Sequence, residues 1–384
     1  MKLPIYLDHH ATTPVDPHVF EAMRPYFTEH FGNASSKTHA FGWRAEEAVT
    51  LAREQVAKLI HAEPKDVVWT SGTTESNNFA LMGVVRAQSK RGDHVITCAT
   101  EHRSVLEVLR ALEPLGVKTT VLPVDGNGTV DPQAVREAIT DRTILISIMA
   151  ANHEIGTIHT GVVNGDIGKI AKEKGVYFHV DAAQACGKIP IDVKAMGIDL
   201  LSMSAHKVYG PKGVGALWIR SREPHVRIEP LLYGGGQESD RRPGTLAVPN
   251  IIGMGRAFEI AGLEMDAESK RLTNLRERLK TGLLEQIPKV LLNGHPTDRL
   301  PGNLNLSFLG QRSDALIPKI RDIAVSSGSA CASSETAKPS YVILALGGAK
   351  ERAVSSLRFG LGRFTTEEEI DFAVERVVEA VNAH

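Results

Sequence analysis

The chain passes between two apolar runs through the stretch Ser202-Met203-Ser204-Ala205-His206-Lys207-Val208-Tyr209-Gly210-Pro211-Lys212-Gly213-Val214-Gly215. One run ends in Leu200-Leu201 and the other is Ala216-Leu217-Trp218-Ile219, so we expect two buried strands joined by tight turns of small residues. This pattern places Lys207 at the exit of the first strand. A lysine held partly out of water has a lowered pKa, which makes its amine a better nucleophile. Lys212 is expected to be an ordinary solvated charge.

A carboxylate is expected close to this lysine. The strand-like run from Val176 to Val180 delivers Asp181 at its end, and Asp181 precedes Lys207 by 26 positions. That spacing fits two neighbouring strand ends of one sheet. Pyridoxal phosphate requires such a pair, because a lysine holds its aldehyde and a carboxylate keeps its pyridine nitrogen protonated. The two residues therefore indicate a pyridoxal phosphate enzyme.

A third segment is suited to hold a phosphate group. Ser71-Gly72-Thr73-Thr74 follows the short strand Val67 to Thr70 and opens an apolar-periodic segment that we expect to be a helix. The free N–H groups of a helix N-terminus bind anions. Taken alone, the segment is more simply an ordinary helix cap, but the presence of Lys207 and Asp181 favours a phosphate cradle.

Composition limits the classes of function. The chain has 44 basic and 45 acidic residues and a net charge of -1, so it has no general attraction for nucleic acid or membranes. No apolar run near the N-terminus is long enough for a signal peptide, so we expect a cytoplasmic protein. Its three cysteines, Cys98, Cys186 and Cys331, are far apart, and its histidines show no zinc-binding spacing. Neither a disulfide framework nor a metal site is expected.

Strand and helix candidates alternate from Asp93 onward, as is typical of α/β proteins with a mostly parallel sheet covered on both faces. The residue composition changes after residue 245. Residues 250–287 have the composition of a long helix, and a second, smaller domain is expected to follow it. The strand candidates of the first domain are Val67 to Thr70, His94 to Cys98, Lys118 to Val124, Thr143 to Met149, Val176 to Val180, Leu200 to Ser204 and Gly215 to Ile219.

Four motifs then point to a known family. They are Ser71-Gly72-Thr73-Thr74-Glu75-Ser76-Asn77-Asn78, Asp181-Ala182-Ala183-Gln184, Ser204-Ala205-His206-Lys207 and Ser326-Ser327-Gly328-Ser329-Ala330-Cys331. Together they resemble the motifs of the pyridoxal-phosphate-dependent cysteine desulfurases of the NifS/IscS type, within the class V aminotransferases. The resemblance extends from Tyr6 to Thr365, nearly the whole chain.

The resemblance implies a fold-type-I transferase whose large domain, residues 12–260, has a mostly parallel seven-stranded sheet between helices. A smaller α+β domain would consist of residues 1–11 and 261–384. The implied enzyme is a homodimer that converts L-cysteine to L-alanine and passes the sulfur to an acceptor such as an iron–sulfur scaffold protein. The resemblance implies four catalytic residues: Lys207, Cys331, His102 and Asp181. It implies that the cofactor is contacted by Thr73, Thr74, His102, His153, Asp181, Gln184, Ser204, His206, Lys207 and, from the partner subunit of the dimer, Thr245. It implies that the substrate is contacted by Asn152 and Arg358.

Cys331 lies in a run of small polar residues, Ser326 to Ser334, which we expect to form a mobile loop. An exposed thiol on such a loop can ionise, attack the sulfur of bound cysteine and carry the persulfide away. Cys98 and Cys186 lie in apolar or alanine-rich surroundings, and we expect them to be buried.

Other functions remain open at this point. A selenocysteine lyase or an aminotransferase would use the same cofactor, although an aminotransferase would not need Cys331. A catalytically idle docking platform for cluster-assembly partners is the alternative of another class, and the set of Lys207, Asp181, His102 and Cys331 speaks against it.

The chain departs from the family pattern close to the cofactor. It has Asn152-His153-Glu154 where the family usually has Asn-Asn-Glu. An imidazole can still donate one hydrogen bond, but it is larger than an asparagine side chain and can titrate. The segment Thr157 to Gly165 and the cysteine loop are also longer than usual. We expect these departures to affect the reaction rate and the electronic properties of the cofactor, but not the class of reaction.

Overall fold

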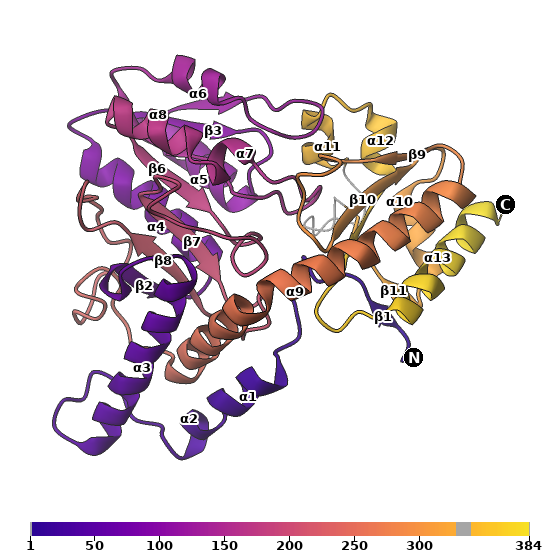
Figure 1. Ribbon diagram of the computed structural model, residues 1–384. Helices are drawn as coiled ribbons and strands as arrows, with labels where there is room; N and C mark the ends of the chain where they lie inside the picture. Colours follow the sequence, from indigo (N-terminus) through magenta and orange to yellow (C-terminus); the bar gives the residue numbers. More distant parts are fainter. Residues whose placement is uncertain (1, 328–338, 384) are drawn as a thin grey trace.

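The computed structural model describes residues 2–327 and 339–383. Figure 1 shows a large α/β part and a smaller part connected by the long helix α9 (Val248–Gln286), which runs through both. Cys331 lies outside the described residues, so its role stays a prediction.

The large part is built on a seven-stranded sheet with the strand order β2-β8-β7-β6-β5-β3-β4. Strands β4, β3, β5, β6 and β7 run parallel, whereas β8 is antiparallel to both β7 and β2. The predicted seven-stranded, mostly parallel sheet is confirmed. The strands are β2 (Val67–Thr70), β3 (His94–Cys98), β4 (Lys118–Leu122), β5 (Thr143–Ser147), β6 (Tyr177–Asp181), β7 (Leu200–Ser204) and β8 (Gly215–Ile219).

Two strands end earlier than the apolar pattern predicts. Apolar residues continue beyond β5 to Met149, and the Ile148 N–H still donates to the His179 carbonyl of β6 at 3.2 Å. The Met149 N–H, however, donates to the buried carboxyl group of Glu101 at 2.6 Å instead of to a neighbouring strand. Similarly, β4 ends at Leu122, not at Val124. The apolar pattern therefore extends past the point where regular strand pairing ends.

Helices cover both faces of this sheet, because its strands are apolar on both sides. Helices α3, α6, α8 and the first half of α9 share one hydrophobic core with the sheet, and α4 and α5 share the core on the opposite face. The helices of the large part before α9 are α1 (Pro17–Met23), α2 (Pro25–Thr28), α3 (Ala40–Leu59), α4 (Thr73–Gln88), α5 (Arg103–Leu112), α6 (Pro132–Ala138), α7 (Thr160–Val163) and α8 (Asp166–Lys174).

The smaller part has its own core, to which the N-terminal segment contributes Ile5 and Leu7. Its central strand β10 (Asn303–Phe308) lies antiparallel between β9 (Val290–Leu292) and β12 (Ser356–Gly360), and β1 (Ile5–Tyr6) pairs with β11 (Ile323–Ala324). This arrangement supports the proposed grouping of residues 1–11 with 261–384. Its helices after α9 are α10 (Ser313–Leu316), α11 (Tyr341–Ala345), α12 (Lys350–Val354) and α13 (Glu367–Asn382).

The described residues contain neither a membrane-spanning helix nor a metal-binding cluster. In the described ranges, no helix is long and apolar enough to cross a membrane. Among the same residues, no cluster of three or more His, Cys, Asp or Glu side chains is placed to hold a metal ion.

Candidate active site

A cavity of about 690 Å³ opens where the carboxyl ends of β3, β5, β6 and β7 meet. Ligands of open α/β sheets bind at this edge, because loops and helix N-termini surround it. The first turn of α4, residues 8–12, Ser326 and Arg358 complete the walls. The predicted site residues that line the cavity are Thr73, Thr74, His102, His153, Asp181, Gln184, Ser204, His206, Lys207 and Arg358.

Lys207 is held in a tight turn directly after β7. The N-terminal segment fixes this turn: the Thr13 N–H donates to the His206 carbonyl at 2.9 Å, and the Tyr209 N–H donates to Thr13 Oγ1 at 2.9 Å. Gly210 is required because a Cβ there would lie 2.8 Å from the Cβ of Ala205. Local sterics and two hydrogen bonds thus place the lysine at the cavity, as predicted from its position at a strand exit.

Asp181 is the last residue of β6, and both of its carboxylate oxygens have partners. Its Oδ1 accepts from the Ala183 N–H at 2.9 Å, and its Oδ2 accepts from Asn77 Nδ2 at 2.7 Å. The side chain is buried yet lines the cavity. The carboxylate is therefore fixed in a position from which it can face a bound ring.

A hydrogen-bond chain connects Asp181 to His102. Asn77 Nδ2 also donates to Ser104 Oγ at 2.8 Å, and this hydroxyl lies 2.8 Å from Nδ1 of His102. The Ser104 N–H points at the same ring nitrogen at 3.2 Å, so Nδ1 is an acceptor and the proton of the neutral ring is on Nε2. Burial and the charge of Lys207 lower the pKa of His102, although Asp181 acts in the opposite direction. His102 is therefore an imidazole with a defined tautomer.

The end of the cavity at the first turn of α4 is suited to a phosphate. Helix α4 begins there after Gly72, whose φ of +151° favours glycine. Thr73 Oγ1 and Ser204 Oγ are buried and have no hydrogen-bond partner in the part of the chain that the structure describes. Unpaired buried hydroxyls are costly unless a ligand satisfies them. Together with the helix N-terminus and the charge of Lys207, they fit an anionic group.

His206 also belongs to this end of the cavity. Its Nδ1 lies 3.1 Å from Thr12 Oγ1. Burial and the nearby charge of Lys207 lower the pKa of His206 to about 4, so the imidazole is neutral at physiological pH. It can offer one N–H, while Lys207 and Lys212 supply the positive charge around the cavity.

Arg358 reaches the cavity from β12 in the smaller part. Its guanidinium donates to the His153 carbonyl at 2.7 Å, to Asp8 Oδ1 at 2.8 Å and to Ser326 Oγ at 3.3 Å. These contacts join three separate segments at one wall. An arginine held at this wall can bind a substrate carboxylate through charge-assisted hydrogen bonds.

His153 packs its ring edge-on against His102, with ring centroids 5.2 Å apart. Its Nε2 lies 3.8 Å from Glu154 Oε1, while Glu154 Oε2 accepts from Ser340 Oγ at 2.5 Å. Burial lowers the pKa of His153 well below its ordinary value, and His102 and Lys207 add to this effect. The unusual histidine is therefore a neutral neighbour of the catalytic candidate.

Two predicted residues in the described part of the chain, Asn152 and Thr245, do not line the cavity. The amide of Asn152 is occupied within the chain, because it donates to the Thr100 carbonyl at 2.9 Å and accepts from the Glu154 N–H at 2.8 Å. Asn152 thus shapes the turn that carries His153, and its contact with substrate stays a prediction. Thr245 is exposed on the loop before α9. Cys331 is outside the described residues.

Several residues of the site received no role from the sequence. Asn77 lies one helical turn after Thr73, so the 3.6-residue period could have placed it on the face of α4 toward the site. Glu101 has no comparable signal in the sequence. Burial, together with the negative charge of Asp181, raises the pKa of Glu101 to about 8, so this carboxyl group is largely protonated at neutral pH.

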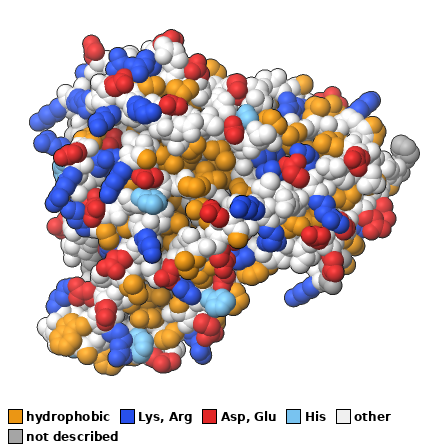
Figure 2. Space-filling model, viewed as in Figure 1, with side chains coloured by type: hydrophobic (Ala, Val, Ile, Leu, Met, Phe, Trp, Pro, Cys, Tyr) orange, Lys and Arg blue, Asp and Glu red, His pale blue; other side chains and the backbone are white. Residues whose placement is uncertain are grey.

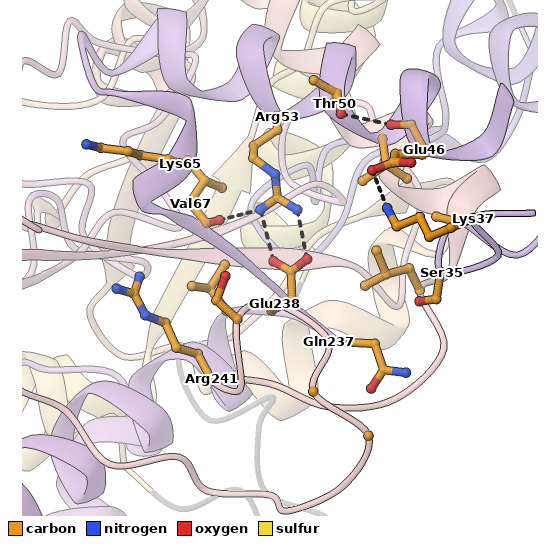
Figure 3. A pocket seen from close by; sticks show the side chains of 17 residues that line it. Ser35, Lys37, Glu46, Thr50, Arg53, Lys65, Val67, Gln237, Glu238 and Arg241 are labelled. Carbon is orange, nitrogen blue, oxygen red and sulfur yellow. Dashed lines mark hydrogen bonds and ion pairs between the residues drawn. The ribbon is translucent and has the colours of Figure 1, made fainter. Parts of the chain in front are cut away.

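A second cavity, of about 560 Å³, lies between α3 and the loop at residues 235–246 (Figure 3). Its charged side chains mostly neutralise one another: Arg53 forms two hydrogen bonds to Glu238, at 2.7 and 2.9 Å, and Lys37 pairs with Glu46. Glu238 also accepts from the Trp69 N–H at 2.9 Å. The contacts of Glu238 therefore anchor the loop to α3 and β2.

Fold and site together define the class of protein. An α/β sheet that brings a lysine, an aspartate and a histidine to one cavity beside a phosphate-binding helix end is the arrangement of a pyridoxal phosphate enzyme. The chain belongs to the aminotransferase class-V family, whose model matches residues 5–372. Enzymes of this family depend on pyridoxal phosphate.

Individual relatives show which kind of class-V enzyme the chain is similar to. The chain is 54% identical to the cysteine desulfurase IscS of Anaeromyxobacter dehalogenans (strain 2CP-C) over 381 residues, 99% of this chain and 93% of the relative. It is 50% identical to the cysteine desulfurase IscS of Rickettsia rickettsii (strain Iowa) over 382 residues, 100% of this chain and 92% of the relative. A solved structure of a NifS-like protein superposes with a TM-score of 0.90 at 36% identity and covers 98% of both chains.

The contact between His153 and His102 leads to a prediction. In His153→Asn, the smaller side chain should admit water beside His102 and so reduce the burial that lowers the pKa of His102. This change should raise the pKa of His102 toward its ordinary value. NMR titration of the histidine ring protons, with the cofactor absorption band followed in parallel, would measure this shift. Exposed His225, changed to asparagine, provides the control. Superimposable titrations of the wild type and His153→Asn would show that His153 does not influence the site.

Proposed function

We propose that the protein is a cysteine desulfurase, which converts L-cysteine to L-alanine and collects the sulfur as a persulfide on Cys331. The observation that carries this proposal is the convergence of Lys207, Asp181, His102 and Arg358 on one cavity. The similarity to relatives named cysteine desulfurase IscS supports the choice of substrate.

Bound pyridoxal phosphate supplies an aldehyde that reacts with amines and a protonated ring that accepts electrons. Lys207 would hold the aldehyde, and Asp181 would keep the ring nitrogen protonated. Gln184, which lines the cavity, would hydrogen-bond the phenolic oxygen. The phosphate would be held by Thr73, Thr74, Ser204 and His206.

The side chains around the substrate divide the remaining work. Arg358 binds the carboxylate of cysteine, and the amine of Lys207 takes the proton from the α carbon. His102 handles protons through Nε2, since its Nδ1 is occupied by Ser104. The thiolate of Cys331 then attacks the substrate sulfur. The S–S bond forms as the C–S bond breaks, and the substrate carbon takes up protons to become alanine.

We further propose that two copies of the chain form the active unit, with Thr245 completing the phosphate site of the partner. The loop that carries Thr245 is anchored by Glu238 and by Arg242, whose Nε donates to Glu75 at 2.9 Å. Large apolar side chains are exposed on the lobe formed by α1–α3, where Figure 2 shows hydrophobic atoms at its lower left. A second copy would cover them. They include Phe20, Phe27, Phe31, Phe41 and Trp43, each more than half exposed.

The sulfur acceptor and the location in the cell belong to the same proposal. Relatives of the IscS type support transfer of sulfur to an acceptor protein, such as an iron–sulfur scaffold. A cytoplasmic location stays a prediction.

Product analysis tests the proposed function. The purified protein, loaded with pyridoxal phosphate and supplied with L-cysteine and a reducing thiol, should release alanine and sulfide in equal amounts. An aminotransferase would instead produce a keto acid. A selenocysteine lyase would release alanine only from selenocysteine. Either of these results would replace the desulfurase proposal.

A further inference from the structure

We propose that Lys188 is a positioning residue that fixes the side-chain amide of Gln184, so that Gln184 presents an N–H donor to the cofactor. The inference rests on the proposed function, because it concerns the cavity assigned to pyridoxal phosphate. Lys188 lies in the turn after β6, one helical period beyond Gln184, and takes no part in the steps described above.

The geometry determines which way the amide faces. Lys188 Nζ donates to Gln184 Oε1 at 2.9 Å, and Gln184 Nε2 donates to the His10 carbonyl at 2.9 Å. An ammonium group only donates and a carbonyl only accepts. A flipped amide would therefore oppose its NH₂ group to the ammonium and its oxygen to the carbonyl. Lys188 and His10 together permit one orientation.

That orientation leaves a donor for the cavity. The NH₂ group of Gln184 has two hydrogens, of which one is used by the His10 carbonyl. Gln184 lines the cavity, so the second hydrogen can reach a ligand there. A donor stabilises a negatively charged phenolic oxygen, whereas the oxygen of a flipped amide would repel it.

Lys188 is itself held in place. Ser269 Oγ, from α9, donates to the Lys188 carbonyl at 3.1 Å, and the Lys188 N–H donates to the Ala185 carbonyl at 3.0 Å. Lys188 and Lys207 border the same small hollow, about 20 Å³ in volume, which has room for about one water molecule. Burial and the positive charge of Lys207 lower the pKa of Lys188 to about 7, so the amine is protonated at pH 6.

The test measures binding of pyridoxal phosphate to the apo-protein at pH 6. Lys188→Met should raise the Kd about 10-fold, which corresponds to the loss of one well-placed hydrogen bond. It should also move the absorption maximum of the bound cofactor. Lys188→Arg, which keeps a donor, should stay within about 2-fold of the wild type. Lys194→Met removes an exposed lysine and serves as the control.

A double-mutant cycle separates positioning from a general effect of charge or folding. If Lys188 acts through Gln184, adding Lys188→Met to Gln184→Ala should leave the Kd unchanged. An equal loss in both backgrounds would overturn the proposal, as would wild-type binding by Lys188→Met. Loss of binding in Lys188→Arg as severe as in Lys188→Met would also contradict it. Thermal melts of the apo variants identify any that do not fold, and Lys188→Leu, which also lacks a donor, replaces Lys188→Met in that case.

The two proposals fail in different ways. If the wild-type protein binds no pyridoxal phosphate, the proposed function is wrong and the role of Lys188 is lost with it. If the wild type binds the cofactor and produces alanine but the cycle is additive, only the role of Lys188 is wrong.

Discussion

Lys207→Ala is expected to lose turnover by roughly 10⁴-fold or more, because one change removes both the amine that holds the cofactor and the base at the substrate α carbon. Among the described residues, no other lysine occupies the same position. Lys212 also lines the cavity, but it lies beyond the turn fixed by Thr13 and Tyr209. The loss should appear as absence of alanine from L-cysteine in an assay that follows single as well as multiple turnovers.

Chemical trapping provides the independent measurement. Borohydride treatment of the wild-type protein, followed by peptide mapping, should place the reduced cofactor on Lys207. The control variant Lys194→Ala, which removes an exposed lysine away from the cavity, should retain the trapped product and most of the turnover. A reduced cofactor on Lys212 or on any other lysine would contradict the assignment.

Cys331→Ala should separate cofactor chemistry from sulfur transfer. Lys207 and Asp181 act before the carbon–sulfur bond breaks, whereas the thiol of Cys331 is required only to receive the sulfur. The variant should therefore bind pyridoxal phosphate and change colour when L-cysteine is added, yet form almost no alanine and no protein persulfide. Cys186→Ala is the control and should form both. Near-normal alanine production by Cys331→Ala would favour a lyase.

The other cysteines allow a test of accessibility in the same experiment. Cys98 and Cys186 are buried in the structure, as predicted. Burial, together with the charge of Glu101, raises the pKa of Cys98, and burial with the charge of Asp181 raises the pKa of Cys186 to about 12. Both should react slowly with a thiol reagent, because the thiolate is the reactive form. Mass spectrometry should find Cys331 labelled first, and equal labelling would remove the basis for its special role.

Local patterns predicted much of the fold. The buried strands β2, β3, β7 and β8 have the predicted bounds, because each is a short apolar run with turn residues at its ends. Helix α13 begins after Thr366, as the Thr and Glu residues of a capping box indicate. Such signals involve residues close in sequence, and neither tertiary contacts nor partner chains are needed to produce them.

Contacts between distant segments could not be predicted in this way. The chain from Asp181 through Asn77 and Ser104 to His102 depends on distances set by three different elements. The burial that makes Glu101 a largely protonated acid is likewise a property of the packed protein. Composition and periodicity contain the residue types but not these distances.

The N-terminal segment sets an order in which the protein can be completed during synthesis. Ile5 pairs with Ile323, and Asp8 binds Arg358, so both residues wait for partners that are synthesised much later. Such distant pairing forms slowly, because a long loop must close first. The sheet with Lys207 and Asp181 can assemble on the ribosome earlier, since domains fold as they emerge. The cavity is thus left without its Asp8–Arg358 wall until residue 358 has emerged, and a nascent chain that stops short of β12 would carry the cofactor residues without the wall that receives the substrate.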